Sequence, residues 1–386
     1  MRVLFTCVIG HGHFHPMVPL ARAFETAGHE VRFATDPAFC AYVRGAGFEA
    51  TPAGLDHADA LARFVATTPG WAQVPAAGRN KLMYPGMFGR VRAPKMLQDL
   101  TPLVAAWRPD LVIHEAAEMA GAIAAEVAGI PHAEHSFGIL RPGELRRRAT
   151  EAVAPISAAL GIPNPGVGGL GGELYLDICP PGVQHPEIAE LANVQPLRPV
   201  GFDAAADAHL PHWVATLPVR PTVYVTMGTV FNEDAAVFRA VLDGLLGEPV
   251  NVIVTVGAKG DPALLGPQPD NVRVERYIPQ SQLLPHCDLL VAHAGSGALL
   301  GALNAGVPIL AIPQGADQFM NAERIVEVGL GLRLLPEELD AGAVRELTRR
   351  LLGEDGFRAV ARGQQAAIEA MPSPATVVPI LEALGA

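Results

Sequence analysis

The chain has 386 residues, of which half are hydrophobic and 17% are charged, and its formal net charge is -11. This length exceeds what one ordinary core uses, so we expect a globular protein of two domains. The acidic balance argues against a nucleic-acid partner and favours small-molecule ligands. No apolar stretch is long enough to span a membrane. Four widely separated cysteines without a CxxC pair predict buried thiols and a cytoplasmic location.

The first half of the chain alternates strand-like and helix-like segments. Residues 2–9 form a strand-like run, and a helix-like stretch that ends on a glycine follows it. A second strand is expected at 29–35 and a helix from Asp36, because Asp-Pro is a good helix start. Further strands are expected at 109–115 and 131–137. This alternation predicts parallel βαβ units.

The segment from Pro52 to about Ala106 has no clean periodicity. It carries several large side chains, namely Trp71, Met83, Tyr84, Met87 and Phe88. Long irregular segments are often binding loops or lids. The alternative is an ordinary surface excursion whose aromatic rings point inward, and both interpretations stay open.

The alternation restarts in the second half. Strands are expected at 220–229, 250–257, 271–278, 287–295, 306–313 and 329–335. We place a first domain at 1–205, a linker at 206–220, a second domain at 221–365 and a terminal segment at 366–386. The predicted fold class is α/β, with two doubly wound, Rossmann-like domains that face a central cleft. Ligands are expected at the carboxyl ends of the strands.

Two glycine-rich stretches do not support a dinucleotide site. The stretch GVGGLG at 166–171 matches GxGxxG in letters but follows no strand. The stretch GHGHFH after the first strand has a histidine where the third glycine belongs. We therefore discard a dehydrogenase interpretation.

The stretch LLVAHAGSGALLGAL predicts an anion site. It runs from a strand through His293, Gly295, Ser296 and Gly297 into a helix. Backbone N–H groups and the dipole at such a helix start suit a diphosphate, which His293 and Ser296 can also hydrogen-bond. A serine-hydrolase elbow would need glycine at two positions that hold alanine.

Two further strand ends carry residues suited to the same ligand. The stretch YVTMGT ends on Gly228 and Thr229, and PILAIPQGADQF opens a helix near Asp317. An adjacent acid and amide, Asp317 and Gln318, can bind sugar hydroxyls. The alternative for Asp317 is that it only caps the helix.

Together these stretches resemble a known family. The ordered set VTMGT, RYIPQSQLLPHCDLLVAHAGSGALLGAL and GVPILAIPQGADQFMNAERI resembles the nucleotide-sugar signature of inverting GT-B glycosyltransferases, in particular the actinobacterial enzymes that glycosylate natural products such as antibiotics. With GHFHPMVPLARAFETAGHEVRFAT and PDLVIHEAAEMAGAIAAEVAGIP, the resemblance covers nearly the whole chain. It implies transfer of a sugar from a nucleotide-sugar co-substrate to a hydrophobic aglycone, without cofactor or metal. It also implies a terminal helix that packs back on the first domain.

The resemblance implies a set of donor-binding residues. These are Gly228, Thr229, Ile278, His293, Gly295, Ser296, Gly297, Asp317 and Gln318. His293 would hold the α-phosphate, and the backbone of Ile278 would pair with the base. Many UDP-sugar relatives carry an acidic residue eight positions after the histidine, where this chain has Gly301. A dTDP-sugar, which lacks the ribose 2'-hydroxyl, therefore fits better than a UDP-sugar.

The three histidines at 11, 13 and 15 raise the question of the catalytic base. Histidine suits a base near neutral pH, and a carboxylate on its far nitrogen fixes the tautomer. The resemblance implies His13, the histidine of the GHxxP turn, with Glu115 as its partner in place of the commoner aspartate. His11 is the alternative base and Glu118 the alternative partner. A zinc cluster is disfavoured, because the alternate spacing shares a face only in a strand.

The acceptor would meet a set of mostly aromatic residues. They are Phe14, Trp71, Met83, Tyr84, Phe88, His135, Phe137 and Phe319. For His135 a structural role is an equal alternative. Two other functions stay open, a nucleotide-sugar epimerase or hydrolase of GT-B type and a catalytically silent activator protein. The sequence also leaves a homodimer open.

Overall fold

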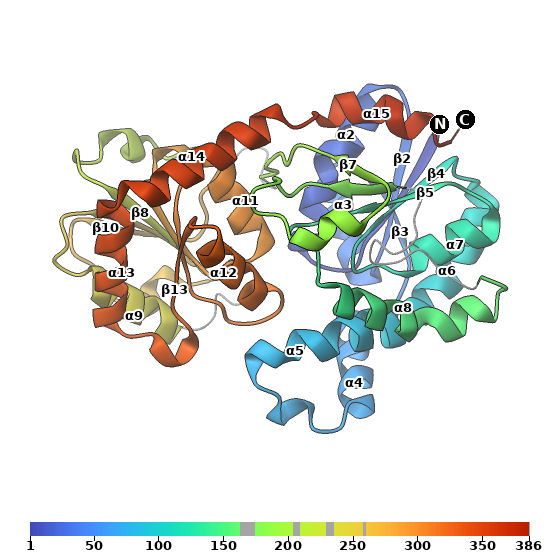
Figure 1. The fold of residues 1–386 in the computed structure, drawn as a ribbon, viewed down its shortest axis with the longest axis horizontal. Helices are drawn as coiled ribbons and strands as arrows, with labels where there is room; N and C mark the ends of the chain where they lie inside the picture. The colour runs from blue at the N-terminus through green and yellow to red at the C-terminus, as the bar shows by residue number, and fades with distance from the viewer. Residues whose placement is uncertain (163–173, 204–208, 229–234, 258–259, 386) are drawn as a thin grey trace. The chain divides into compact units, whose positions relative to one another are not determined.

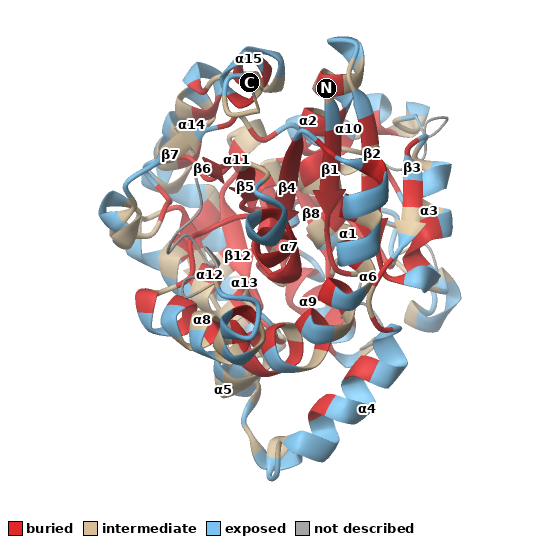
Figure 2. Cartoon of the chain, turned by 90° about the vertical axis from the view of Figure 1, so that its right-hand side faces the viewer, coloured by how far each residue is buried: buried red, intermediate tan, exposed pale blue. Residues whose placement is uncertain are grey.

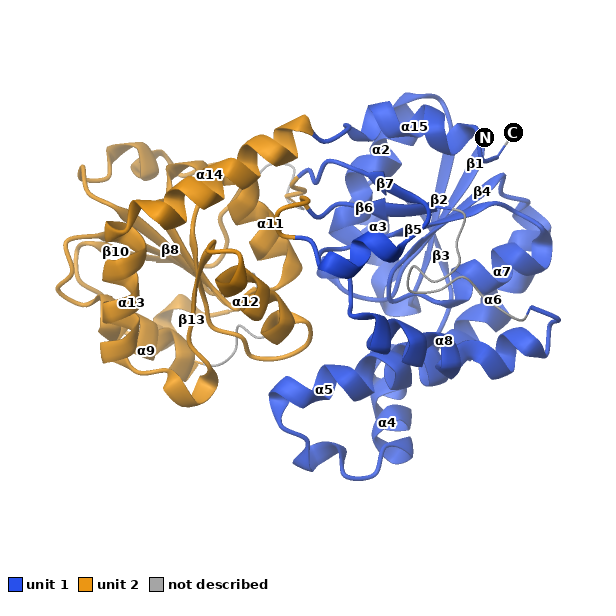
Figure 3. Ribbon diagram, in the orientation of Figure 1, with its two compact units in different colours: residues 1–179, 184–200, 371–386 blue, residues 180–183, 201–370 orange. Residues whose placement is uncertain are grey.

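The computed structural model describes residues 1–162, 174–203, 209–228, 235–257 and 260–385. The chain divides into two compact units. Unit 1 holds Met1–Cys179, Gln184–Val200 and Met371–Ala386, and unit 2 holds Pro180–Val183 and Gly201–Ala370 (Figure 3). No described helix is both long enough and apolar enough to cross a bilayer. The glycine-rich stretch at 166–171 lies outside the described residues.

Unit 1 is built on a parallel sheet whose strand order is β3-β2-β1-β4-β5-β6-β7 (Figure 1). The strands are β1 (Arg2–Thr6), β2 (Glu30–Thr35), β3 (Glu49–Pro52), β4 (Leu111–Glu115), β5 (His132–His135), β6 (Leu174–Asp177) and β7 (Val194–Pro196). β1 and β4 pair directly, with Thr6 opposite His114, so their carboxyl ends adjoin. Both strands are buried on both faces, as the helix-covered sheet of a βαβ fold requires (Figure 2).

Helices and short helical turns cover this sheet. They are α1 (His11–Phe14), η1 (His15–Met17), α2 (Val18–Thr26), η2 (Pro37–Phe39), α3 (Cys40–Gly45), α4 (His57–Thr67), η3 (Trp71–Gln73), α5 (Ala76–Met83), η4 (Tyr84–Arg92), α6 (Ala93–Trp107), α7 (Ala120–Ala128), α8 (Gly143–Ala158), η5 (Pro186–Glu190) and α15 (Pro374–Glu382). The terminal helix α15 belongs to unit 1 and buries Val377, Val378 and Leu381. Its Glu382 Oε1 lies 2.7 Å from His29 Nε2, just after α2.

The expectation of an irregular segment between Pro52 and Ala106 is wrong. Most of that segment is helical, because α4, α5, η4 and α6 follow one another there. The middle piece, η4, is a π-helix, whose wider turn does not keep the 3.6-residue spacing on which helix recognition depends. A side chain at Gly86 would overlap the ring of Phe64, and one at Gly89 would overlap Ala152 on α8. The glycines therefore let η4 pack closely against its neighbours.

Unit 2 repeats the doubly wound plan with the strand order β10-β9-β8-β11-β12-β13, all parallel. The strands are β8 (Thr222–Thr226), β9 (Asn251–Thr255), β10 (Val272–Glu275), β11 (Leu289–Ala292), β12 (Ile309–Ala311) and β13 (Gly331–Arg333). The helical elements are η6 (His212–Thr216), α9 (Ala235–Leu245), η7 (Pro262–Leu265), α10 (Gln280–Leu283), η8 (Leu284–His286), α11 (Ser296–Ala305), α12 (Gln318–Glu327), η9 (Pro336–Glu338), α13 (Ala341–Gly353) and α14 (Asp355–Ala370). The two doubly wound sheets confirm the predicted α/β class. All four cysteines are buried thiols.

Candidate active site

The three histidines lie on a helical turn that follows β1. Gly10, at a φ of 137°, opens the turn, and its carbonyl accepts hydrogen bonds from the N–H groups of His13 and Phe14. Residues four apart in a helical turn share a face, whereas the residue between them points elsewhere. His11 and His15 accordingly lie together, with ring centroids 5.2 Å apart. The alternate spacing therefore separates His13 from the other two.

His11 and His15 belong to an aromatic cluster with Tyr42. The ring of His11 lies 4.6 Å from that of Tyr42, and His15 Nε2 is 2.7 Å from the Tyr42 hydroxyl oxygen. Burial lowers the pKa of His15 to about 3, and the neighbouring His11 adds to this effect. His15 is therefore neutral at physiological pH. Among the described residues, no group of three or more histidines, cysteines or carboxylates is arranged to hold a metal ion.

His13 faces the carboxylate of Glu115 at the end of β4. His13 Nδ1 lies 3.1 Å from Glu115 Oε1, and the side chains are 22% and 0% exposed. Both atoms are buried and make no well-aligned hydrogen bond to any described residue. The other oxygen of Glu115 accepts a hydrogen bond from the N–H of Ala117 at 2.7 Å, which fixes the carboxylate. Adjoining ends of β1 and β4 thus bring an imidazole and a buried carboxylate into contact.

Glu118, the alternative partner, is engaged elsewhere. It accepts hydrogen bonds from the Thr6 hydroxyl and from the N–H groups of Ala120 and Gly121 at the start of α7. Burial raises the pKa of Glu118 to about 7, although these three donors oppose the shift. Its contacts hold the loop between β4 and α7, and of the two carboxylates Glu115 is the one that lies against His13.

Two of the predicted acceptor residues flank His13. The ring of Phe137 lies 5.0 Å from that of His13, and the ring of Phe88 lies 5.9 Å away. Tyr84 is 1% exposed, and its hydroxyl donates a hydrogen bond to the carbonyl of Ala116. Phe88 and Phe137 thus flank the candidate base, and Tyr84 packs behind them against Phe88.

The other predicted acceptor residues do not lie at His13 in this way. Phe14 is fully buried against Phe33 and Phe39, so its prediction as an acceptor contact is corrected to a core residue. Trp71 and Met83 pack into the small core of the α4–α5 excursion, where the Trp71 ring lies 4.9 Å from Phe64.

His135 and Phe319 complete that set. His135 has no exposed surface, and its Nδ1 is 2.6 Å from the carbonyl oxygen of Ser136. Burial lowers the pKa of His135 to about 4. Phe319 lies in unit 2 on α12 and is half-buried.

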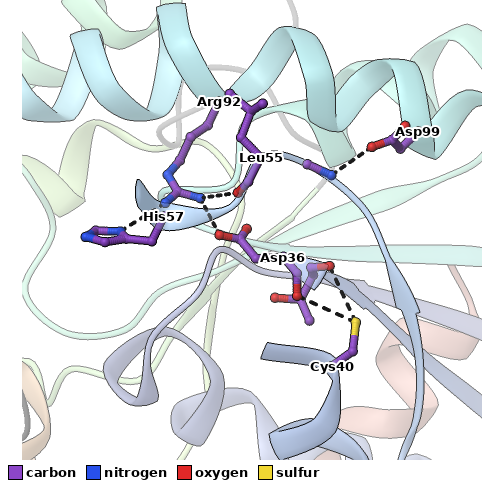
Figure 4. Close-up of polar contacts among 8 residues, drawn as sticks. Asp36, Cys40, Leu55, His57, Arg92 and Asp99 are labelled. Carbon is purple, nitrogen blue, oxygen red and sulfur yellow. Dashed lines mark hydrogen bonds and ion pairs between the residues drawn. The ribbon is translucent and has the colours of Figure 1, made fainter. Parts of the chain in front are cut away.

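A cavity of unit 1 carries a buried ion pair that the sequence analysis missed. Its lining includes Asp36, Phe88, Arg92 and Glu118. Arg92 Nη1 donates to Asp36 Oδ2 at 2.6 Å, and Arg92 Nη2 lies 3.2 Å from His57 Nδ1 (Figure 4). Burial raises the pKa of Asp36, whereas Arg92 opposes that shift. The sequence shows Asp36 only as a helix start, and Arg92 lies in the π-helix, so no motif joins them.

In unit 2, His293 follows β11 and leads into α11. A side chain at either Gly228 or Gly295 would overlap the imidazole ring, so the two glycines allow the backbone to close around it. His293 Nδ1 is buried and has no hydrogen-bond partner among the described residues. Burial lowers the pKa of His293 to about 4, so the ring is neutral at physiological pH. A neutral imidazole with an unpaired nitrogen can still serve as a hydrogen-bond donor to an anion.

Polar groups from α11 and α12 meet beside His293. The Ser296 hydroxyl donates to Asp317 Oδ2 at 2.7 Å, and Asn321 Nδ2 donates to the same oxygen and to the carbonyl of Ala294. Asp317 occupies the position before α12 but makes no capping hydrogen bond, so the interpretation as a cap alone is wrong. Asn321 was not singled out from the sequence, although it lies within the stretch GVPILAIPQGADQFMNAERI that carries the resemblance.

The remaining predicted donor residues are placed as follows. Gln318 is 3% exposed, and its Oε1 accepts hydrogen bonds from the N–H groups of Gln314 and Gly315. Ile278 is buried after β10, and Gly297 is exposed in the first turn of α11. Thr229 lies outside the described residues. The backbone N–H groups of this first turn and the helix dipole suit an anionic ligand.

Comparisons with known proteins agree with this architecture. Residues 22–228 match the family model "Erythromycin biosynthesis protein CIII-like, N-terminal domain", and residues 239–384 match the C-terminal domain of the same description. The L-demethylnoviosyl transferase of Streptomyces niveus is 36% identical over 98% of this chain and 96% of that protein. The aklavinone 7-beta-L-rhodosaminyltransferase of Streptomyces galilaeus is 32% identical over 100% of this chain and 96% of that protein.

A solved structure leads to the same assignment. The crystal structure of the glycosyltransferase SsfS6 of Streptomyces sp. SF2575, complexed with thymidine diphosphate, matches with a TM-score of 0.81 and 26% identity over 99% of each chain. The predicted GT-B architecture and glycosyltransferase class are confirmed by these matches. The chain therefore belongs to the Erythromycin biosynthesis protein CIII-like family and is a GT-B glycosyltransferase of natural-product biosynthesis.

Proposed function

We propose that the chain moves a sugar from a dTDP-sugar to a hydrophobic natural-product aglycone with inversion at the anomeric carbon, and that His13 is the general base. The observation that carries the proposal is the contact between His13 Nδ1 and the buried Glu115 carboxylate. A carboxylate at Nδ1 favours the tautomer with its proton on that nitrogen, which leaves Nε2 to accept a proton.

The chemistry is a single displacement. His13 Nε2 takes the proton of an acceptor hydroxyl while the acceptor oxygen forms a bond to the anomeric carbon. The bond from that carbon to the diphosphate oxygen breaks, and the nucleoside diphosphate leaves with the electron pair. Glu115 stabilises the imidazolium that forms. Attack from the face opposite the leaving group inverts the anomeric carbon.

Unit 2 supplies the groups that would hold the diphosphate. The first turn of α11 offers backbone N–H groups, and His293 and Ser296 lie beside it. These dipoles stabilise negative charge as it develops on the leaving group. Transfer should accordingly proceed at the same rate when EDTA is added.

The choice of a thymidine nucleotide rests on two observations. SsfS6 is complexed with thymidine diphosphate. At Gly301 on α11, a side chain would press on Leu284 Cδ1 at 3.1 Å, and no carboxylate stands there to bind a ribose 2'-hydroxyl. In a thermal-shift comparison, thymidine diphosphate should raise the melting temperature more than UDP does. Equal shifts would contradict this donor assignment.

The reaction itself is tested by mass spectrometry. The purified chain is incubated with TDP-L-rhamnose or TDP-glucose and a panel of hydrophobic hydroxyl compounds, with and without the acceptor. The proposal predicts an acceptor product heavier by one sugar, with inverted anomeric configuration by NMR. Sugar release or isomerisation in the acceptor-free reaction, without any transfer, would instead indicate a hydrolase or an epimerase.

A further inference from the structure

Arg141 is a buried cation that contacts Phe137, one of the two rings that flank the candidate base. It lies between β5 and α8 and is 8% exposed. Its Nε is buried, and no hydrogen bond or ion pair joins its guanidinium to any of the described residues. Buried charges are normally paired, because an unpaired charge costs free energy when water is removed. Within the described part of the chain, Arg141 therefore has no hydrogen-bond or ion-pair partner.

The guanidinium is held by two aromatic rings instead. It lies 3.9 Å from the ring centroid of Tyr84 and 4.4 Å from that of Phe137. Such cation–π contacts stabilise a buried cation in part, but they use the faces of the rings and leave its N–H donors unfilled. Contacts of this kind fix where the guanidinium points while keeping its donors available.

Aromatic rings connect Arg141 with His13 on two sides. Phe137 touches both Arg141 and His13, with its ring 5.0 Å from the imidazole. On the other side, Tyr84 contacts Phe88 at 6.2 Å, and Phe88 lies 5.9 Å from His13. Arg141 is thus linked to the candidate base through aromatic rings on two sides.

A second buried arginine, Arg146, also has N–H groups without a hydrogen-bond acceptor among the described residues. Arg146, on α8, is 2% exposed and gives Nη2 to Glu187 at 3.1 Å, while its Nε and Nη1 have no partner among the described residues. The Glu115 and Glu134 carboxylates influence the pKa of Tyr84, as do both arginines, yet neither carboxylate forms an ion pair with Arg141. Carboxylates nearby therefore do not use up the donors of Arg141.

We propose that Arg141 recognises an oxyanion on a planar aromatic acceptor, a carboxylate in the simplest case. The flat rings of Phe88 and Phe137 suit an aromatic body, and the guanidinium fork matches a carboxylate in geometry. Arg141 is then a specificity-determining residue that selects acidic acceptors. This inference rests on the proposed function, since it names the class of acceptor that His13 would deprotonate.

The test compares two probes of the same shape, 2-naphthoate and the neutral 2-naphthamide, by calorimetry. Wild-type protein should bind 2-naphthoate about tenfold to a hundredfold more tightly than 2-naphthamide, as a charge-assisted hydrogen bond supplies. Arg141→Met should bind both probes alike, and Arg141→Lys should keep part of the preference. The matched control is Arg32→Met, because Arg32 also stacks on a ring, that of Trp107 at 4.6 Å, away from His13.

A purely structural role predicts a different result. If Arg141 only supports the fold, Arg141→Met lowers the melting temperature without probe and leaves the preference for 2-naphthoate intact. If Arg141 is an unpaired buried charge, as we propose, Arg141→Met should leave the melting temperature without probe unchanged or raise it. An unchanged preference in Arg141→Met, or none in the wild type, would overturn the proposal. Since the measurement is of binding, His13→Ala should keep the preference even where sugar transfer fails, which separates this inference from the proposed function.

Discussion

At the scale of single residues, we propose that Glu115 orients His13 and stabilises its protonated form. Glu115→Gln keeps the shape but removes the charge. We expect kcat to fall on the order of 10²-fold with thymidine diphosphate affinity unchanged, because the neutral amide no longer stabilises the imidazolium that forms during transfer. The control is Glu126→Gln, a half-exposed carboxylate at His132. Equal kcat values for Glu115→Gln and Glu126→Gln would contradict the proposal that Glu115 assists His13.

The Asp36–Arg92 pair gives a prediction about stability and pH. Arg92→Met leaves Asp36 buried without its partner, which should cost about 3–5 kcal/mol of unfolding free energy near pH 8. Burial already raises the pKa of Asp36, and loss of Arg92 raises it further. A raised native pKa means that stability is lost as pH rises through it, so the deficit should shrink between pH 8 and pH 5. Urea unfolding at several pH values measures this.

Arg63→Met is the control for that series. Arg63 is exposed on α4, so its replacement should change stability by less than about 0.5 kcal/mol at every pH. A deficit in Arg92→Met that stayed constant with pH would show that the variant suffers from lost packing rather than from an unpaired carboxylate.

The residues of the candidate site were predictable only where a motif carries them. His13, Glu115, His293 and Ser296 stand at strand ends or in glycine-containing turns, which sequence patterns mark. Arg92 and Arg141 lie where no sequence pattern marks them, and tertiary packing alone brings them to their partners. Asn321 lies within a signature stretch, but the stretch does not show which of its side chains meets Asp317. Phe14 shows the opposite error, since a position beside a functional turn does not place a side chain in the site.

At the scale of elements, the strands of both sheets were predictable because a parallel sheet needs long apolar runs. β3, β6 and β7 were not, since they are short strands toward the edges of the unit 1 sheet. The helices between Pro52 and Ala106 were missed because η4 breaks the usual period. Regular spacing thus identified the regular elements and failed at the π-helix, which carries Phe88, one of the two rings that flank His13.

The terminal helix α15 gives a test of packing in unit 1. Leu381 is fully buried, whereas the adjacent Ile380 is 41% exposed. Leu381→Ala should cost about 2–5 kcal/mol through the lost apolar contacts and the cavity that remains. Ile380→Ala should cost less than about 1 kcal/mol. Hydrogen exchange of the β1 amides in urea reports the stability of unit 1, and equal losses would show that α15 does not stabilise it.

At the scale of the whole molecule, the same doubly wound plan occurs twice with different chemistry at the strand ends. Unit 1 carries a histidine, a buried carboxylate and aromatic rings, which suit activation of an acceptor. Unit 2 carries a helix start, a neutral histidine and the Ser296 hydroxyl, which suit a nucleoside diphosphate. Proton removal from the acceptor and binding of the donor nucleotide are therefore two functions that can be measured independently.

The most direct test measures both functions, sugar transfer and nucleotide binding, on the same samples. With a donor and acceptor pair that yields product, kcat is measured for wild type, His13→Ala and His11→Ala, and thymidine diphosphate affinity is measured by calorimetry on the same samples. We expect His13→Ala to lower kcat by at least about 10²-fold and His11→Ala to retain most of the wild-type kcat. All three proteins should bind thymidine diphosphate with the same affinity. Undiminished kcat in His13→Ala, with nucleotide affinity intact, would contradict the assignment of His13 as the base.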